Sequence, residues 1–225
     1  MARRSASADT PRLALIGDIH GQHAALRAVL DAAAAQGITQ GVCVGDVVMR
    51  GPDPAECIAT MRELGWPTVR GNTDIKVLKG HPRPPTHPAS DRVGSRSWSI
   101  RRLHDEDLAW LADLPARVRV TVGGVRVVVS HGHPGDLSVI VDEDTPVSEL
   151  RRQTHALHAD VLVVGHTHRQ MVRTAGRSLV VNPGAVGEGQ PHDMRPRWAW
   201  LEVTPEGPVI HEEIVEAPLA PPRED

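Results

Sequence analysis

Five short polar clusters constrain the fold of this chain more than any other feature of its sequence. Each cluster follows an apolar run, and in chain order they occupy residues 17–21, 45–46, 71–74, 130–133 and 165–168. The runs that precede them, which include LALI, VRVVV and VLVV, are typical of buried strands. Carboxylate, amide and imidazole side chains placed at successive strand ends predict one site, assembled from distant parts of an α/β fold.

The length and composition favour one soluble α/β domain. The chain has 225 residues and contains no Phe or Tyr, so its core is expected to consist of Val, Leu, Ile and Ala. We expect residues 12–216 to form a single domain, with disordered tails at 1–11 and 217–225. Two cysteines are too few for a disulfide framework.

The charge and the hydropathy exclude some partners. The formal net charge is −3, so no basic field is available to attract nucleic acid. A small basic group, Arg92, Arg96, Arg101 and Arg102, is interpreted as a solvated helix face, with an oligonucleotide patch as the alternative. No apolar run approaches the roughly 18 residues needed to cross a bilayer. A cytoplasmic location without membrane contact is therefore expected.

Hydrophobic periodicity predicts two packed, mixed sheets flanked by helices. Strands are expected at 12–17, 41–44, 68–70, 118–122, 125–130, 161–164, 171–174, 178–182, 198–203 and 209–215. Helices are expected at 23–36, 54–64, 73–78, 100–111 and 146–157. The proline-rich segment 80–97 is predicted to be a surface loop or a flap.

The donors in the five clusters suit metal ions. They comprise two carboxylates, one amide and four imidazoles: Asp18, His20, Asp46, Asn72, His131, His166 and His168. Residues i and i+2 at an extended strand end project the same way, which lets each Asp-x-His or His-x-His pair share an ion. Mixed oxygen and nitrogen donors favour Mn²⁺, Fe, Zn²⁺ or Co²⁺ over Ca²⁺ or Mg²⁺ alone. Seven donors suit two ions about 3.5–4 Å apart.

Taken singly, each of these motifs is also typical of an ordinary turn, but the ordered set resembles the calcineurin-like metallophosphoesterase superfamily. Its pattern is D-x-H, G-D, G-N-H-D/E, a strand-end H and G-H-x-H, and it spans residues 12–187 here. Segment 182–187, NPGAVG, is similar to the Asn-Pro-Gly-Ser turn of small bacterial members. The resemblance implies a four-layer α/β/β/α sandwich. It also implies a ligand division of Asp18, His20, Asp46 and His168 on one metal ion, and of Asp46, Asn72, His131 and His166 on the other.

Arg50 is the candidate for holding substrate phosphate. Segment 45–51, GDVVMRG, resembles the G-D-x-V-D-R-G segment of the phosphoprotein phosphatase branch, whose arginine has this role. Met49 stands where that branch has its second aspartate, so the match is partial. A guanidinium four residues past Asp46 is also suited to grip phosphoryl oxygens. The alternative is an ordinary surface arginine.

Thr73 is the main departure from the family pattern. Family members with strong phosphatase activity carry a histidine there, and a threonine hydroxyl cannot protonate a leaving group near neutral pH. Small phosphodiesterases of the superfamily often lack this histidine, so Thr73 favours a diester substrate. His133 is the first candidate replacement, with a simple loop histidine as the alternative, and His23, His81 and His87 are weaker candidates. Asp74 is expected to orient the turn that carries Asn72.

The resulting expectation is a hydrolase that cleaves a small phosphodiester, such as a cyclic nucleotide, with a hydroxide that bridges two divalent metal ions. Manganese is the expected metal, with Fe, Zn, Co and Ni as alternatives. A phosphomonoesterase or protein phosphatase is the first rival, supported by Arg50. A non-catalytic interaction scaffold is the second, because the retromer subunit of this superfamily uses the fold in that way. Segments 80–97 and 133–145 are expected to select the substrate.

Overall fold

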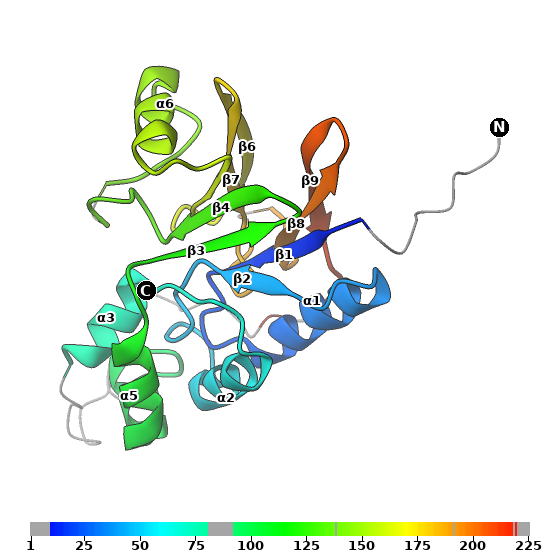
Figure 1. Ribbon diagram of the computed structural model, residues 1–225. Coiled ribbons are helices and arrows are strands. Elements are labelled where there is room, and N and C mark those ends of the chain that lie inside the picture. The colour runs from blue at the N-terminus through cyan, green and yellow to red at the C-terminus, as the bar shows by residue number, and fades with distance from the viewer. Residues whose placement is uncertain (1–9, 81–91, 138, 191, 218, 220–225) are drawn as a thin grey trace.

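Two β-sheets form the centre of the molecule, and helices cover both outer faces (Figure 1). The computed structural model describes residues 10–80, 92–137, 139–190, 192–217 and 219. The first sheet contains, in spatial order, β2 (Gly41–Cys43), β1 (Arg12–Ile16), β8 (Arg197–Thr204) and β9 (Gly207–Ile214). The second contains β3 (Arg117–Val122), β4 (Val125–Ser130), β5 (Val161–Val163), β7 (Ser178–Pro183) and β6 (Gln170–Ala175).

The helices divide between the two outer faces. The first sheet is covered by α1 (His23–Ala35) and α2 (Pro54–Leu64), with α3 (Asn72–Leu78), α4 (Arg96–Arg102) and α5 (Asp105–Asp113) beside them (Figure 1). The second sheet is covered by α6 (Val147–Ala156). The layers therefore run α/β/β/α, which confirms the predicted sandwich of two mixed sheets.

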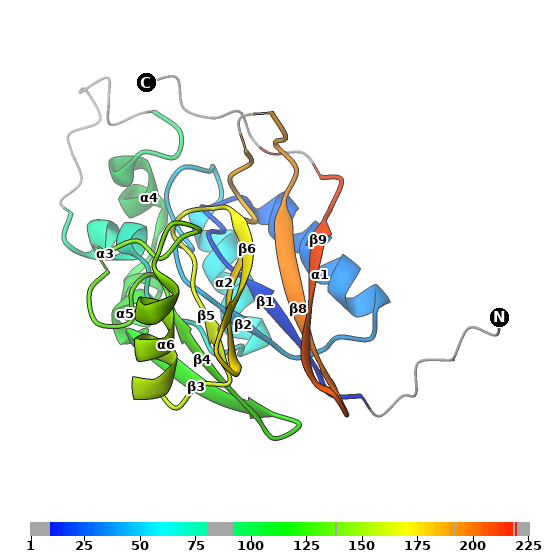
Figure 2. The same cartoon turned by 90° about the horizontal axis from the view of Figure 1, so that it is seen from above.

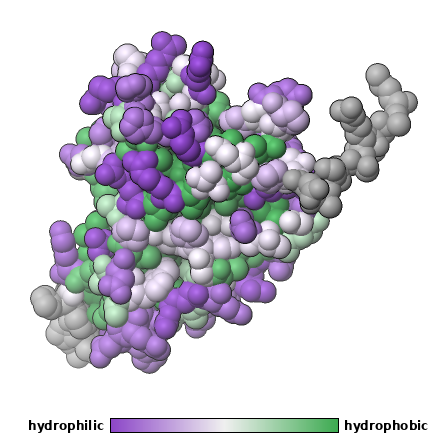
Figure 3. Space-filling view, viewed as in Figure 1, coloured by the Kyte–Doolittle hydropathy of each residue, from purple (hydrophilic) through white to green (hydrophobic). Residues whose placement is uncertain are grey.

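Apolar side chains fill all three spaces between the layers. Leu15 and Val129 lie in the layer between the two sheets, Leu26 lies under the first sheet, and Leu150 lies over the second. Trp198 is also fully buried, so the core is not purely aliphatic as expected from the composition. In the space-filling view, hydrophilic side chains gather over α6 and over the opposite helices, with hydrophobic ones between them (Figure 3).

Parallel pairing brings the motif-bearing loops to one edge of the sandwich (Figure 2). β1 runs parallel to β2, and β5 runs parallel to both β4 and β7. Backbone hydrogen bonds then join the loops, with Asp18 N donating to Gly45 O at 2.9 Å and Gly165 N donating to the carbonyl of His131 at 2.8 Å. A further bond, from Val186 N to Gly17 O at 3.0 Å, ties the loop after β7 to the loop after β1.

The predicted helix at 100–111 is wrong in its extent, because the chain forms two helices there. α4 ends at Arg102, Leu103 and His104 are extended, and α5 begins at Asp105. The carboxylate of Asp107 accepts a hydrogen bond from His104 N at 2.9 Å, which caps a new helix instead of continuing the old one. Three acidic residues in the first turn of α5 also favour a helix start at this position.

The predicted strand at 68–70 is reduced to one parallel bridge, between Cys43 and Thr68. Val69 N still donates to Cys43 O, but Arg70 N donates to Pro115 O, so the pairing stops after a single step.

The predicted loop at 80–97 is shorter than expected, since α4 begins at Arg96. Residues 81–91, 1–9 and 220–225, which include most of both predicted tails, lie outside the described residues.

Within the described parts of the chain, no helix has the length and apolar character required to cross a membrane.

Candidate metal centre

The structure brings all seven predicted donors together at the joined loops. Asp18, His20, Asp46 and His131 are buried to 1% exposure or less. Asn72, His166 and His168 are half-buried and form the rim of the same cluster. Ionisable groups are almost never buried in this number unless they are paired or coordinate metal ions.

One group of donors comprises Asp18, His20 and His168. Asp18 Oδ1 lies 3.3 Å from His168 Nε2, and the Nε2 atoms of His20 and His168 lie 3.2 Å apart. The three residues offer ligand atoms within 4.8 Å of one another, which is close enough to surround a single ion.

A second group comprises Asn72, His131 and His166. Asn72 Oδ1 lies 2.9 Å from His131 Nε2 and 2.7 Å from His166 Nδ1, and those two imidazole nitrogens are 3.3 Å apart. His131 Nδ1 donates to Val44 O at 2.8 Å, and this bond leaves the lone pair of Nε2 directed into the cluster.

Asp46 lies between the two groups. Its Oδ2 atom is 3.8 Å from His20 Nε2 in the first group, and its Oδ1 atom is 3.5 Å from His131 Nε2 in the second. A carboxylate with one oxygen facing each group can bridge two cations. Asp18 also lies within 4.8 Å of Asp46 and His131, so the exact division of ligands between two ions stays a prediction.

The donor set fits divalent cations by its chemistry. Two imidazole Nε2 atoms at 3.2 Å cannot both present lone pairs to each other without repulsion. Asp18 Oδ1 is buried, and within the described chain no protein group satisfies it with a hydrogen bond. A cation between these atoms satisfies all of them at once.

The burial of ionisable groups in the donor cluster is unfavourable for the protein alone, and it shifts their pKa values. Burial, with the charge of Asp18 acting in the same direction, raises the pKa of Asp46. Burial, together with the charge of Asp46, raises the pKa of Asp74 to about 7. Burial lowers the pKa of His20 well below its usual value, so its imidazole is neutral and can act as a ligand. A bound cation stabilises ionised carboxylates together with a neutral imidazole ligand such as His20.

The backbone of the site is strained. Eight non-glycine residues have positive φ in the described chain, and seven of them lie in these loops, with φ between 49° and 73°: Asp18, His20, Asp46, Met49, Arg50, His166 and His168. Such a conformation costs about 1–3 kcal/mol for each residue. Five of the seven are predicted metal ligands. The strained backbone therefore coincides with the positions whose side chains must point into the donor cluster.

Asp74 holds the loop that carries Asp46. Its carboxylate accepts hydrogen bonds from the backbone N–H groups of Asp46, Val47, Val48 and Gly71 at 2.9–3.3 Å. Asp74 thus joins the loop after β2 to the start of α3, where Asn72 lies. Its effect on the site extends beyond the Asn72 turn expected from the sequence.

Thr73 is placed as a structural residue. Its backbone N–H donates to Asp46 Oδ1 at 2.8 Å, and its hydroxyl donates to Val48 O at 3.0 Å. The side chain is buried, and the hydroxyl proton is already used. The structure therefore gives Thr73 a role in orienting Asp46 and none of the geometry of a catalytic proton donor.

His133 is not brought to the cluster. Its Nε2 atom lies 3.3 Å from Glu149 Oε1 on α6, and its Nδ1 atom accepts a hydrogen bond from Gly135 N at 3.1 Å. Two residues of spacing from His131 do not carry the side chain into the site, because the chain turns after β4. Both ring nitrogens are engaged away from the donors, which favours the loop-histidine alternative.

Arg50 lies at the rim of the cluster, as the sequence predicts, but it has an unexpected partner. Its guanidinium forms an ion pair with Glu188, whose carboxylate also lies 3.3 Å from His168 Nδ1. Glu188 was not among the site residues predicted from the sequence. The available signal was its position, since an acidic residue directly follows the NPGAVG segment already assigned to the site.

The sequence model of the calcineurin-like phosphoesterase superfamily domain matches residues 12–205. The chain belongs to this superfamily. The uncharacterized protein MJ0912 of Methanocaldococcus jannaschii is 28% identical over 202 residues, which cover 80% of this chain and 77% of that protein. A metallophosphoesterase from Sphaerobacter thermophilus superposes with a TM-score of 0.73 at 26% identity, over 93% of this chain and 89% of its own.

More distant solved structures share the superfamily fold. The hypothetical protein PH1004 from Pyrococcus horikoshii has a TM-score of 0.74 at 20% identity, over 92% of this chain and 88% of its own. Vacuolar protein sorting 29 from Cryptosporidium parvum has a TM-score of 0.54 at 18% identity, over 91% of this chain and 97% of its own. At these identities the likeness concerns the fold alone.

Proposed function

We propose that this chain is a metal-dependent phosphodiesterase that hydrolyses small, singly charged phosphodiesters such as cyclic nucleotides. The observation that carries the proposal is Asp46, whose two carboxylate oxygens face separate groups of donors. This arrangement suits a pair of cations, and paired cations are typical of phosphoester hydrolysis. Superfamily membership supports the same class of reaction.

The residues divide between two ions. Asp18, His20, Asp46 and His168 would hold one, and Asp46, Asn72, His131 and His166 would hold the other, with manganese as the expected metal. When bound, such ions supply Lewis acidity that lowers the pKa of water and offsets the charge of phosphoryl oxygens.

Arg50 and Asp74 act through the protein itself. The Arg50 guanidinium is 38% exposed at the rim, where its N–H groups can bind two phosphoryl oxygens. Asp74 fixes the peptide groups of the Asp46 loop through four amide hydrogen bonds and so keeps Asp46 between the two donor groups. Both residues orient substrate or ligands and neither transfers a proton.

The diester preference rests on the residues available as general acids. The Thr73 hydroxyl is bonded to Val48 O, and His133 is bonded to Glu149 and Gly135. Neither Thr73 nor His133 is therefore positioned to protonate a leaving group, His23 is bonded to Thr60, and His81 and His87 lie outside the described residues. A general acid is worth about 10²–10⁴-fold, so an enzyme without one favours substrates whose leaving group needs little protonation.

Steady-state hydrolysis tests this function. We expect the manganese-loaded protein to hydrolyse bis-p-nitrophenyl phosphate with a higher kcat/KM than p-nitrophenyl phosphate. His155→Gln, on the opposite side of the second sheet, is the control and should retain activity. No turnover of either compound with Mn²⁺, Fe²⁺, Zn²⁺, Co²⁺ or Ni²⁺ at full occupancy would contradict the proposal. A higher kcat/KM for the monoester would instead support the phosphatase alternative, which Arg50 favours.

The interaction scaffold remains the second candidate, and one observation favours it. Vacuolar protein sorting 29 shares the fold at a TM-score of 0.54. The buried donors count against it, since a scaffold has no use for seven converging metal ligands. A protein that binds two equivalents of metal and hydrolyses no phosphoester would favour this candidate.

A further inference from the structure

Glu188 presents a negative charge at the rim of the candidate metal centre. Its Oε2 atom pairs with the Arg50 guanidinium, lies 3.3 Å from His168 Nδ1 and lies 3.8 Å from His20 Nε2. The atom itself is buried and, among the residues that the structure describes, has no partner with hydrogen-bond geometry, although Glu188 is partly exposed. One carboxylate oxygen thus faces both the predicted phosphate-binding arginine and two predicted metal ligands.

The position of Glu188 is fixed by the residues on both sides. Gly187 N donates to Asp18 O at 2.9 Å, and Gly187 passes so close to Ile19 O that no larger residue fits there. Gln190 Nε2 donates to His168 O at 2.8 Å. The segment is therefore tied to the loops after β1 and β5, and these ties limit how far the carboxylate can withdraw.

This placement changes the charge that a substrate meets. Arg50 offers one positive charge, and Glu188 already compensates it. A phosphodiester carries one negative charge, whereas a phosphomonoester carries close to two near neutral pH, since its second pKa is about 6. The additional charge of the monoester would approach the Glu188 carboxylate, and the repulsion between like charges a few ångströms apart is strong in a partly desolvated site.

We propose that Glu188 is a specificity residue that disfavours doubly charged phosphates and so directs the site toward singly charged phosphodiesters. The proposal rests on the function proposed above and names the substrate feature that the site reads, which is the charge of the phosphoryl group. Discrimination by a repulsive group complements the attraction that Arg50 supplies to both kinds of substrate.

Binding of two small probes to the manganese-loaded protein tests the role of Glu188. Inorganic phosphate at pH 8.5 carries two charges, and dimethyl phosphate carries one. We expect Glu188→Gln, titrated by calorimetry, to bind inorganic phosphate about tenfold more tightly than the unmodified protein and dimethyl phosphate with an affinity changed less than about threefold. Glu188→Ala should shift the same ratio in the same direction, which guards against an effect peculiar to glutamine.

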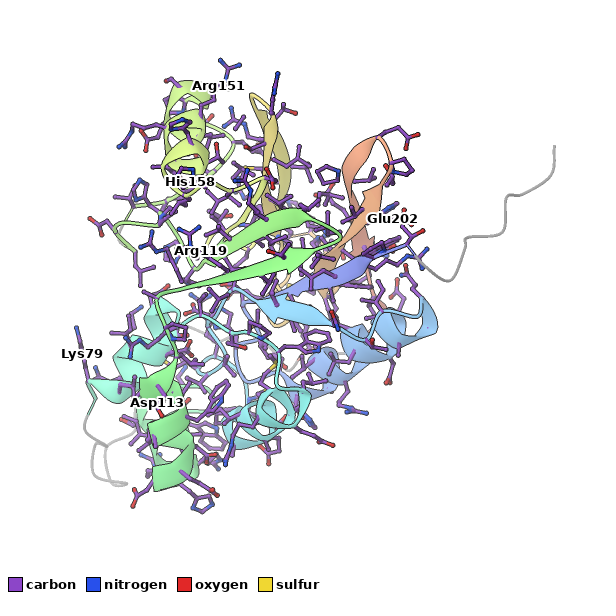
Figure 4. All side chains as sticks on the ribbon, in the orientation of Figure 1. Lys79, Asp113, Arg119, Arg151, His158 and Glu202 are labelled. Carbon is purple, nitrogen blue, oxygen red and sulfur yellow. The ribbon has the colours of Figure 1, made fainter. Side chains whose placement is uncertain are left out.

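The matched control is Glu202→Gln, which removes the same charge from β8 (Figure 4). Glu202 pairs with Arg12 and His211, and we expect no change in the ratio of the two affinities. Metal content, measured by mass spectrometry, should be equal in all the proteins. One metal ion fewer in the two Glu188 variants would overturn the proposal, because it would make Glu188 a ligand.

The remaining outcomes separate this inference from the proposed function. If every protein binds both probes with an unchanged ratio, the specificity role of Glu188 is wrong and the phosphoester site stands. If the metal-loaded proteins bind neither probe, both proposals fail.

Discussion

The two ends of the β-sandwich differ in which residue types adopt positive φ angles. At the end without the candidate site, three hairpins use glycine for their positive φ angles: Gly123 and Gly124 between β3 and β4, Gly176 between β6 and β7, and Gly207 at the start of β9. At the other end, glycines such as Gly21 and Gly45 share this backbone region with aspartate, histidine, methionine and arginine residues, including Asp46 and His166. In these three hairpins the chain only reverses, and glycine adopts the required conformation without strain.

The difference shows what the strained end is built for. Glycine would relieve the strain after β1, β2 and β5, but it would supply no ligand atom. Asp18, His20 and His168 have this left-handed backbone, and their ligand atoms lie within 4.8 Å of one another. Strain at this end is thus tied to donor direction, and it persists because the surrounding loops are joined by hydrogen bonds.

The largest expected effect comes from Asp46→Asn. The amide keeps an acceptor for Thr73 N but removes the charge between the two donor groups. We expect metal content to fall below two equivalents and kcat/KM for bis-p-nitrophenyl phosphate to fall at least about 10³-fold. Retention of both metals with full activity would refute the bridging role. Urea unfolding in chelator should show the metal-free variant no less stable than the parent, because a buried charge has been removed.

Replacing His166 by Gly and by Ala isolates the strain at the site. Both variants lose the imidazole and its contact with Asn72 Oδ1, so they differ only in backbone freedom at φ 73°. We expect the metal-free glycine variant to be about 1 kcal/mol more stable than the alanine variant by urea denaturation. Equal free energies of unfolding would show that His166 is not strained.

Gly124→Ala is the matching change at the opposite end. A Cβ atom at Gly124 would meet nothing within 4 Å, so any cost comes from φ 85° alone. We expect the free energy of unfolding to fall by about 1 kcal/mol with unchanged phosphodiester hydrolysis. A change in kcat/KM at constant metal content would contradict the separation of the two ends.

The smallest effect is expected for His133→Gln. The ring of His133 is engaged by Glu149 and Gly135, outside the donor cluster. We expect kcat/KM for bis-p-nitrophenyl phosphate to change less than about threefold. The same substitution at His131, two residues earlier, should lower metal affinity at least about 10–100-fold. A large loss of activity in His133→Gln at normal metal content would restore His133 as a proton donor.

The sequence predicted most of the fold and the membership of the donor cluster. Apolar runs that alternate with helical periodicity predicted two packed sheets flanked by helices, and the family resemblance implied the four-layer order. Each donor directly follows a strand or begins a helix beside one, so parallel pairing was sufficient to gather distant residues such as Asp18 and His166. These features depend on local patterns that a sequence displays.

The directions of individual side chains could not be predicted from the sequence. The spacing of His133 from His131 suggested a shared cleft, but the turn after β4 carries His133 to α6. The break between α4 and α5 depends on a capping bond from His104 N to Asp107, which competes with a continuous apolar stripe. Glu188 was missed because its partners, Arg50 and His168, lie far away in the chain. In each case a tertiary contact decided between locally reasonable alternatives.

The four hydrogen bonds accepted by Asp74 have a consequence for how such a protein can diversify. They join the peptide groups around Asp46 and the first turn of α3 into one unit, so we expect a substitution at position 74 to disturb both groups of predicted donors together. The side chains of Arg50 and Glu188 lie at the rim of the site, outside this hydrogen-bonded unit, and pair with each other. New substrate ranges are therefore best sought by randomising Arg50 and Glu188 while Asp74 and its hydrogen-bond partners are left unchanged.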